Sequence, residues 1–203
     1  MVHVLLRALV RYVNLAAKVA LIALLLFAVV RPDLPQFEGK AMTTRLFTFG
    51  ISAVFLPVIW LILRPKRPYP HAIDLCLIAP FLLDTAGNAA DLYGTVEWFD
   101  DAMHYLNWVP WTTAFGLALL EFAPPVPRWA LFGLVLGYGA VTHILWELAE
   151  FLAFIRGGPE EATAYRDTLG DLTLSLCGSL TGALIVTLVA SRRRSGRRTS
   201  PSP

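Results

Sequence analysis

Acidic and histidine side chains recur at helical spacing in four apolar stretches of this sequence. Residues three, four or seven positions apart lie on one face of an α-helix, so each such group is predicted to share a face. The groups are Asp84 with Asn88 and Asp91, Asp100 with His104, His143 with Glu147 and Glu150, and Asp167 with Asp171. Carboxylates and imidazoles bind divalent metal ions and carry protons, so metal-assisted or acid–base chemistry is predicted.

These groups suit a divalent metal ion of unknown identity. Zn, Mn or Fe would fit a mixed carboxylate and imidazole set, and Mg or Ca would fit carboxylates alone. The catalytic candidates are His104, His143, Glu147 and Asp171. The candidate metal ligands are Asp84, Asp91, Asp100, His104, Glu147, Glu150 and Asp171. The sequence has no His-x-x-x-His pair, Gly-x-Ser-x-Gly motif, Walker loop or Rossmann fingerprint that would specify one reaction.

The elements that carry these side chains are long and apolar. Of the 203 residues, 56% are hydrophobic and 16% charged, whereas a typical soluble domain has about a quarter charged residues. A helix of about 20 apolar residues crosses a hydrocarbon core of roughly 30 Å. Six stretches approach this length, at residues 14–30, 44–63, 72–91, 102–122, 128–154 and 168–190. The sequence therefore predicts an all-α membrane protein, a bundle of about six transmembrane helices.

The two ends of the chain are more polar than the bundle. Residues 2–13 place His3, Arg7 and Arg11 four residues apart, which predicts a short basic helix at the membrane interface. Basic residues before an apolar stretch also occur in signal peptides, but no small-residue cleavage site follows, so the first span is expected to be retained. Residues 1–190 are predicted to form one domain, and residues 191–203 a disordered basic cytoplasmic tail.

The distribution of Lys and Arg predicts the orientation. If six spans alternate, 12 basic residues fall on one side and 5 on the other. The five are Arg31, Lys40, Arg45, Arg156 and Arg166. Positive residues are enriched in cytoplasmic loops, so both termini are predicted to be cytoplasmic, in a multi-pass protein of the inner membrane.

With this orientation, all four polar groups lie near the extracytoplasmic ends of their helices. We expect Asp100, His104, Glu147 and Asp171 to meet in one cluster, with Asp84 and Glu150 as close neighbours. Carboxylates packed together raise one another's pKa, so protons, arginines or a metal must compensate them. Asp74 and Glu121, near the opposite ends, are interpreted as ordinary charges at helix ends. The tryptophans, Trp108 among them, fit either a pocket lining or an interfacial belt.

Small residues predict where helices pack closely. Gly178 and Gly182 in the last span, and Gly133 and Gly137 in the fifth, are four residues apart. This spacing lets helix backbones approach each other in membranes.

From Asp100 to Gly182 the order of motifs resembles the VanZ-like membrane proteins and the related YjdF-like group. The family's Asp-Lys-x-x-His is matched at Asp100 and His104, with Asp101 in place of Lys. Its Glu-x-x-Gln followed by an outer Arg is matched at Glu147 and Arg156, with Glu150 in place of Gln. Its Asp-x-x-x-Asn-x-x-Gly-x-x-x-Gly is matched at Asp171, Gly178 and Gly182, with Ser175 in place of Asn. The resemblance implies a bacterial multi-helix membrane protein of the cell envelope, connected in the VanZ case with glycopeptide tolerance, and it supplies no reaction.

Two classes of function remain open. One is a hydrolase or transferase that acts on a lipid or lipid-linked envelope precursor, with metal-bound carboxylates activating water. The other is a binding or transport protein for a cation, a proton or a cationic head group. Transport needs a polar route across the bundle, and the helices are almost wholly apolar beyond Asp84 and His143. Membrane lipid is the expected partner, nucleic acid is not, and the sequence does not indicate an oligomeric state.

Overall fold

The chain folds into helices joined by short turns. The computed structural model describes residues 2–63 and 66–198, and no strand occurs among them. The long helices are α1 (Val2–Val30), α2 (Met42–Leu63), α3 (His71–Ala89), α5 (Phe99–Phe122), α6 (Arg128–Glu150) and α7 (Ala164–Arg198). Between them lie η1 (Pro35–Phe37), α4 (Leu92–Thr95), the π-helix η2 (Phe151–Ile155) directly after α6, and η3 (Pro159–Ala162). The predicted all-α membrane protein is confirmed.

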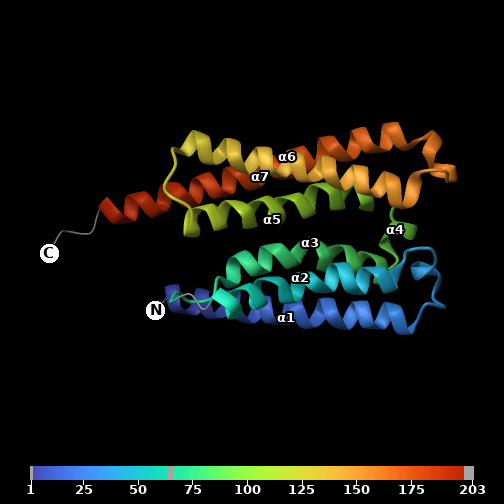
Figure 1. Ribbon diagram of the computed structural model, residues 1–203, viewed down its shortest axis with the longest axis horizontal. Coiled ribbons are helices and arrows are strands. Elements are labelled where there is room, and N and C mark those ends of the chain that lie inside the picture. Colours follow the sequence, from blue (N-terminus) through green and yellow to red (C-terminus); the bar gives the residue numbers. More distant parts are fainter. Residues whose placement is uncertain (1, 64–65, 199–203) are drawn as a thin grey trace. The chain divides into compact units, whose positions relative to one another are not determined.

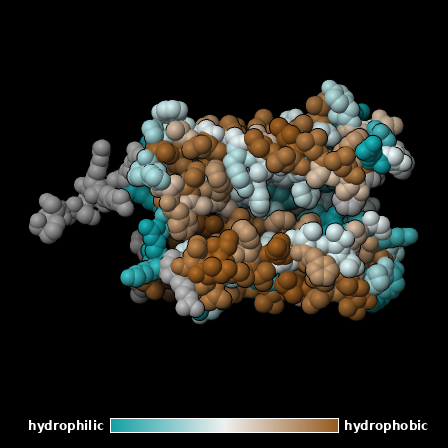
Figure 2. All heavy atoms as spheres, viewed as in Figure 1, coloured by the Kyte–Doolittle hydropathy of each residue, from teal (hydrophilic) through white to brown (hydrophobic). Residues whose placement is uncertain are grey.

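Five segments among the described helices are long and apolar enough to cross a membrane. They are Val4–Val30, Met42–Leu63, His71–Ala89, Arg128–Ala153 and Ala164–Arg193. The predicted sixth span corresponds to α5, whose 24 residues extend about 36 Å. Its first half is less apolar than the other spans because it carries Asp100, Asp101, His104 and Asn107. On the face seen in Figure 2, apolar side chains cover much of the surface and hydrophilic ones gather mainly toward the ends, as expected where helices face lipid.

The first of two compact units extends from Met1 to Met103. Its long helices α1, α2 and α3 run side by side (Figure 1). Leu21 and Leu25 of α1, Phe49 of α2 and Ile78 of α3 belong to its apolar core. Side chains at i and i+4 on α1 share one face, so this helix presents a continuous apolar stripe to its neighbours.

The second unit extends from His104 to Pro203. Its core includes Leu131 and Val135 of α6 and Ala183 and Val186 of α7. A Cβ atom on Gly178 would meet the carbonyl oxygen of Tyr105 on α5, and the side chain of Val186 lies against Gly116. The close approach predicted for Gly178 is therefore present.

Of the other glycines predicted to pack closely, Gly182 contacts a neighbouring helix, whereas Gly133 and Gly137 contact none among the described residues. Gly182 also lies against α5, at the side chain of Thr112 and the carbonyl of Val109, as predicted. Gly133 and Gly137 have open space around them within the described chain, so their predicted packing role is wrong there.

Three boundaries differ from the sequence predictions. The basic segment 2–13 and the first span form one continuous helix, α1, of 29 residues. At about 43 Å it exceeds a hydrocarbon core of roughly 30 Å. Helix α7 runs to Arg198, beyond the start of the predicted tail, and residues 199–203 of that tail lie outside the described residues. Helix α3 ends at Ala89, before the predicted end of its span.

Candidate functional site

Three helices of the second unit bring polar side chains into its interior. His104 lies on α5, His143 and Glu147 lie one turn apart on α6, and Asp171 lies on α7. All four side chains are less than a tenth exposed, and His143 is 1% exposed. Buried ionisable groups among membrane-spanning helices are unfavourable unless they are paired, and they usually mark a functional site.

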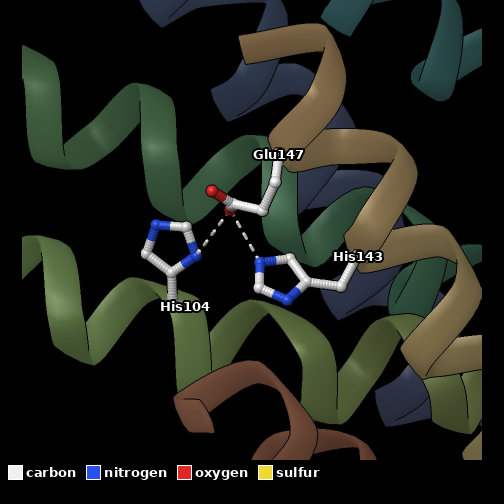
Figure 3. Close-up of side chains that lie close together, drawn as sticks. All are labelled: His104, His143 and Glu147. Atoms are coloured by element: carbon white, nitrogen blue, oxygen red, sulfur yellow. Dashed lines mark hydrogen bonds and ion pairs between the residues drawn. The ribbon is translucent and has the colours of Figure 1, made fainter. Parts of the chain in front are cut away.

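One carboxylate oxygen of Glu147 lies between the two imidazoles. Its Oε1 atom accepts a hydrogen bond of 2.8 Å from Nε2 of His143 and lies 3.9 Å from Nδ1 of His104. Figure 3 shows both rings turned toward this oxygen. On the other side of the His104 ring, Nε2 lies 3.4 Å from Oδ1 of Asp171. Of the predicted cluster, His104, Glu147 and Asp171 thus lie together, and His143 belongs with them.

Trp108 and Ser175 complete the surroundings of the two imidazoles. The Trp108 ring centroid is 4.5 Å from that of His143, and its indole N–H donates to the carbonyl of Gly139 at 3.1 Å. The hydroxyl of Ser175 donates to the carbonyl of His104 at 3.1 Å and lies 3.2 Å from Nε2 of His143. Trp108 therefore lines the site and does not lie in an interfacial belt. Its position one turn after His104 is the sequence signal for this role.

The arrangement of Ser175, His143 and Glu147 differs from a nucleophilic triad. In a triad the serine and the acid contact different nitrogens of the histidine. Here the hydroxyl and the carboxylate both contact Nε2 of His143. One nitrogen cannot donate to the acid and also accept the serine proton, so this geometry does not activate Ser175.

The same side chains could hold a metal ion. One ligand atom from each of His104, His143 and Glu147 lies within 4.8 Å of the other two. Two imidazoles and one carboxylate are the ligand set of several catalytic zinc sites, which leave one position open for water.

Two predicted ligands lie at the edge of this group of helices. Asp100 is exposed and lies one turn before His104 on α5, among the last residues of the first unit. Glu150 is partly buried and is the last residue of α6 before the π-helix. As metal ligands, both residues stay predictions.

Asp84 lies in the first unit, and an arginine compensates its charge there. Its Oδ2 atom is 2.5 Å from a guanidinium nitrogen of Arg45, and its Oδ1 atom accepts a hydrogen bond of 2.8 Å from the hydroxyl of Tyr93. Burial, and then the charge of Asp84, raises the pKa of the Tyr93 hydroxyl. Because the ion pair with Arg45 compensates the charge of Asp84, no metal ion is needed to do so.

Asp91 does not continue the helical face of Asp84 and Asn88. Helix α3 ends at Ala89, and Asp91 has a left-handed backbone with φ of +55°. The i, i+7 relation predicted for Asp84 and Asp91 is therefore wrong, because a helical face exists only while the helix continues.

The interpretation of Asp74 as an ordinary charge at a helix end is also wrong. Its carboxylate is fully buried, and Oδ2 accepts hydrogen bonds of 2.7 Å from Asn14 and Tyr69 and pairs with Lys18 at 2.7 Å. Burial and this hydrogen bond raise the pKa of the Tyr69 hydroxyl. Asp74 is therefore part of a buried network between α1 and α3. By contrast, Glu121 is an exposed charge near a helix end, as predicted.

Comparison with known protein families places the chain in one of them. The family model described as "Predicted membrane protein (DUF2238)" matches residues 13–192, which include every residue of the site. No curated protein and no solved structure matches the chain.

Proposed function

Because the chain belongs to the family of predicted membrane proteins DUF2238, we propose a function for a site embedded among membrane helices. In this proposal His104, His143 and Glu147 of the second unit would hold one divalent metal ion, which would supply an activated water for hydrolysis of a lipid or lipid-linked phosphate. The observation that carries the proposal is the approach of both imidazoles to one buried carboxylate oxygen.

The present distances are close to those a metal would require. Ligands of a tetrahedral zinc ion are roughly 3.3 Å apart, given metal–ligand lengths of about 2.0 to 2.1 Å. The contact between His143 and Glu147 is 2.8 Å and that between His104 and Glu147 is 3.9 Å. These two contacts lie about half an ångström on either side of that separation, and the ligand atoms of all three residues lie within 4.8 Å of one another. The ion would take the place of the hydrogen bond between Nε2 of His143 and the carboxylate.

Asp171 supports the same proposal from outside the ligand set. A histidine that binds metal through one nitrogen usually gives its other N–H to a carboxylate, which fixes the ring and strengthens the ligand. His104 directs Nδ1 toward Glu147 and Nε2 toward Asp171. We therefore assign Asp171 to holding His104, in place of the direct ligand role predicted from sequence.

The proposed chemistry follows from three protein ligands. A metal ion held by these residues would supply a bound water with its pKa lowered to about 7 and positive charge for the phosphate oxygens. In the hydrolysis expected there, the water oxygen would bond to phosphorus, the P–O bond to the leaving alcohol would break, and the leaving oxygen would take up a proton.

The depth of the site favours a substrate held in the membrane. His104 lies five residues after the start of α5, and Glu147 lies three residues before the end of α6. At 1.5 Å per residue, both lie within about 8 Å of their helix ends. Because α5 extends only about 3 Å beyond each edge of a hydrocarbon core of roughly 30 Å, the site lies a few ångströms below the level of the lipid head groups. The bias of basic residues assigns this end to the extracytoplasmic face, and the VanZ-like resemblance agrees with an envelope substrate.

Metal content and turnover test the proposal together. Purified wild-type protein should contain close to one Zn, Mn or Fe per chain, and a screen of envelope lipid phosphates should show turnover that a chelator abolishes. His143→Ala should lose both, whereas Glu121→Gln, an exposed change at the opposite end of α5, should keep both. A wild-type protein without metal, and without turnover after metal is added, would refute the proposal.

A second candidate function is proton or cation binding without catalysis. It is favoured by the two acid–imidazole pairs, His143 with Glu147 and His104 with Asp171, because such pairs can hold protons with no metal present. In that case Glu147→Gln should change the number of protons or cations that the protein binds, and added divalent metal should leave that binding unchanged.

A further inference from the structure

A pocket lies in the second unit at the helix ends opposite the proposed metal site. Leu119, Leu131, Leu134 and Ala190 line it with apolar surface, and Arg128 and Arg193 also line it. The three long helices α5, α6 and α7 therefore all contribute to the pocket. None of these residues takes part in the chemistry proposed above.

The connection between α5 and α6 forms a preformed wall of the pocket. This wall consists of Ala123, Pro124, Pro125 and Val126. Proline fixes the backbone angle φ near −65° and has no amide N–H. The wall is therefore stiff, and its two prolines present no backbone donor that would need water or a polar partner.

The two arginines lie where lipid head groups would lie. Arg128 is the first residue of α6, and Arg193 of α7 lines the same pocket, where the apolar residues of α7 give way to arginines. Leu134 is six residues further along α6, about 9 Å deeper in the bilayer. The pocket thus combines positive charge at head-group level with apolar surface at acyl-chain level.

Both arginine side chains are exposed, so both can reach a ligand. Arg193 pairs with Glu121 at 3.7 Å, but these side chains are 50% and 40% exposed, and such a pair contributes little. A guanidinium binds phosphate oxygens with two parallel hydrogen bonds, which is stronger and more specific than an exposed contact at that distance.

We infer that this pocket binds an anionic phospholipid of the surrounding bilayer. The phosphodiester lies against Arg128 and Arg193, and one acyl chain packs along Leu131 and Leu134. The site is separate from the proposed metal centre, so its occupancy does not depend on metal.

Native mass spectrometry of the full chain tests this inference. The protein is exchanged into bilayer nanodiscs with equal phosphatidylglycerol and phosphatidylcholine, and retained lipids are counted after release. Wild-type protein should retain one phosphatidylglycerol per chain. Arg193→Gln should weaken that retention by about tenfold, as expected for loss of a charge-assisted contact to phosphate. Arg192→Gln removes the same charge from the neighbouring residue, which does not line the pocket, and should leave retention unchanged.

A pocket-filling variant distinguishes lipid binding in this pocket from nonspecific attraction between basic residues and anionic lipid. Ala190→Leu adds three carbon atoms to a buried lining residue and changes no charge. It should also reduce retention of phosphatidylglycerol, and its elution in size-exclusion chromatography confirms that it is folded. Equal loss in Arg192→Gln and Arg193→Gln would overturn the inference, and so would wild-type protein that retains both lipids equally.

Discussion

Replacement of Glu147 by Gln changes one atom of the candidate metal site and removes one charge. The side chain keeps its length, and the amide oxygen can still accept the 2.8 Å hydrogen bond from His143. A carboxamide is a poor ligand for Zn, Mn or Fe. The substitution therefore removes metal binding while it preserves most of the packing around the site.

The expected size of the effect follows from linkage between binding and folding. A ligand present at 100 times its dissociation constant stabilises the folded state by about 2.7 kcal/mol. For a chain of about 200 residues, each kcal/mol shifts the melting temperature by roughly 2 to 4 °C. Metal should thus raise the melting temperature of wild-type protein by about 5 to 10 °C. Without metal, Glu147→Gln should differ from wild type by only about 1 kcal/mol, because it retains a neutral hydrogen bond.

The assay is thermal unfolding of detergent-purified protein, stripped of metal by chelation and then titrated with Zn, Mn or Fe. Wild type and Glu121→Gln should both gain stability as metal is added, and Glu147→Gln should not. If metal stabilises Glu147→Gln as much as wild type, the metal binds elsewhere and the assigned ligand set is wrong. If no metal stabilises wild type, the site does not hold a divalent ion.

Four further outcomes are expected. Asp171→Asn should weaken metal affinity by about 10- to 100-fold in a competition titration, while metal at higher concentration still binds, because His104 loses only its supporting carboxylate. Asp74→Asn should destabilise the protein by about 3 kcal/mol in thermal unfolding, since it leaves the Lys18 ammonium poorly paired, and Lys18→Met in the same chain should recover much of the loss. The pKa of the Tyr93 hydroxyl is raised above its ordinary value of 10.0 because the folded chain favours the neutral phenol. The free energy of unfolding should therefore fall as pH rises above about 10, and it should fall less in Tyr93→Phe. Reporter fusions in the loop between α2 and α3 and in the loop between α6 and α7 should report opposite sides of the membrane, and a common side would contradict the orientation.

Sequence spacing could predict the contacts made within a helix. His143 and Glu147 are four residues apart on an uninterrupted helix, and their side chains meet as that spacing requires. The apolar stretches likewise predicted the long helices to within a few residues at most ends. Contacts between helices were harder to predict, since spacing fixes a face of a helix but leaves open which neighbour that face meets.

Two residues near the ends of α3 show why burial and helix ends could not be predicted from the sequence. Asp74 looked like an interfacial charge because it is the fourth residue of α3, yet Lys18 and Asn14 of α1 enclose it. Its burial depends on the packing of another helix. Asp91 looked helical because apolar residues precede it, but the chain turns into a left-handed conformation there. Local sequence does not distinguish a last helical turn from the turn that ends it.

The π-helix after α6 also affects how the site tolerates changes in chain length. A π-helix holds one more residue per turn than an α-helix, so η2 contains a residue that a regular helix would omit. Deletion of one residue within Phe151–Ile155 would convert this turn to α-helix and leave the phase of α6 unchanged. Deletion of one residue between His143 and Glu147 would instead rotate Glu147 by about 100° away from both imidazoles. A deletion of one residue is therefore expected to be tolerated within Phe151–Ile155 and not between His143 and Glu147.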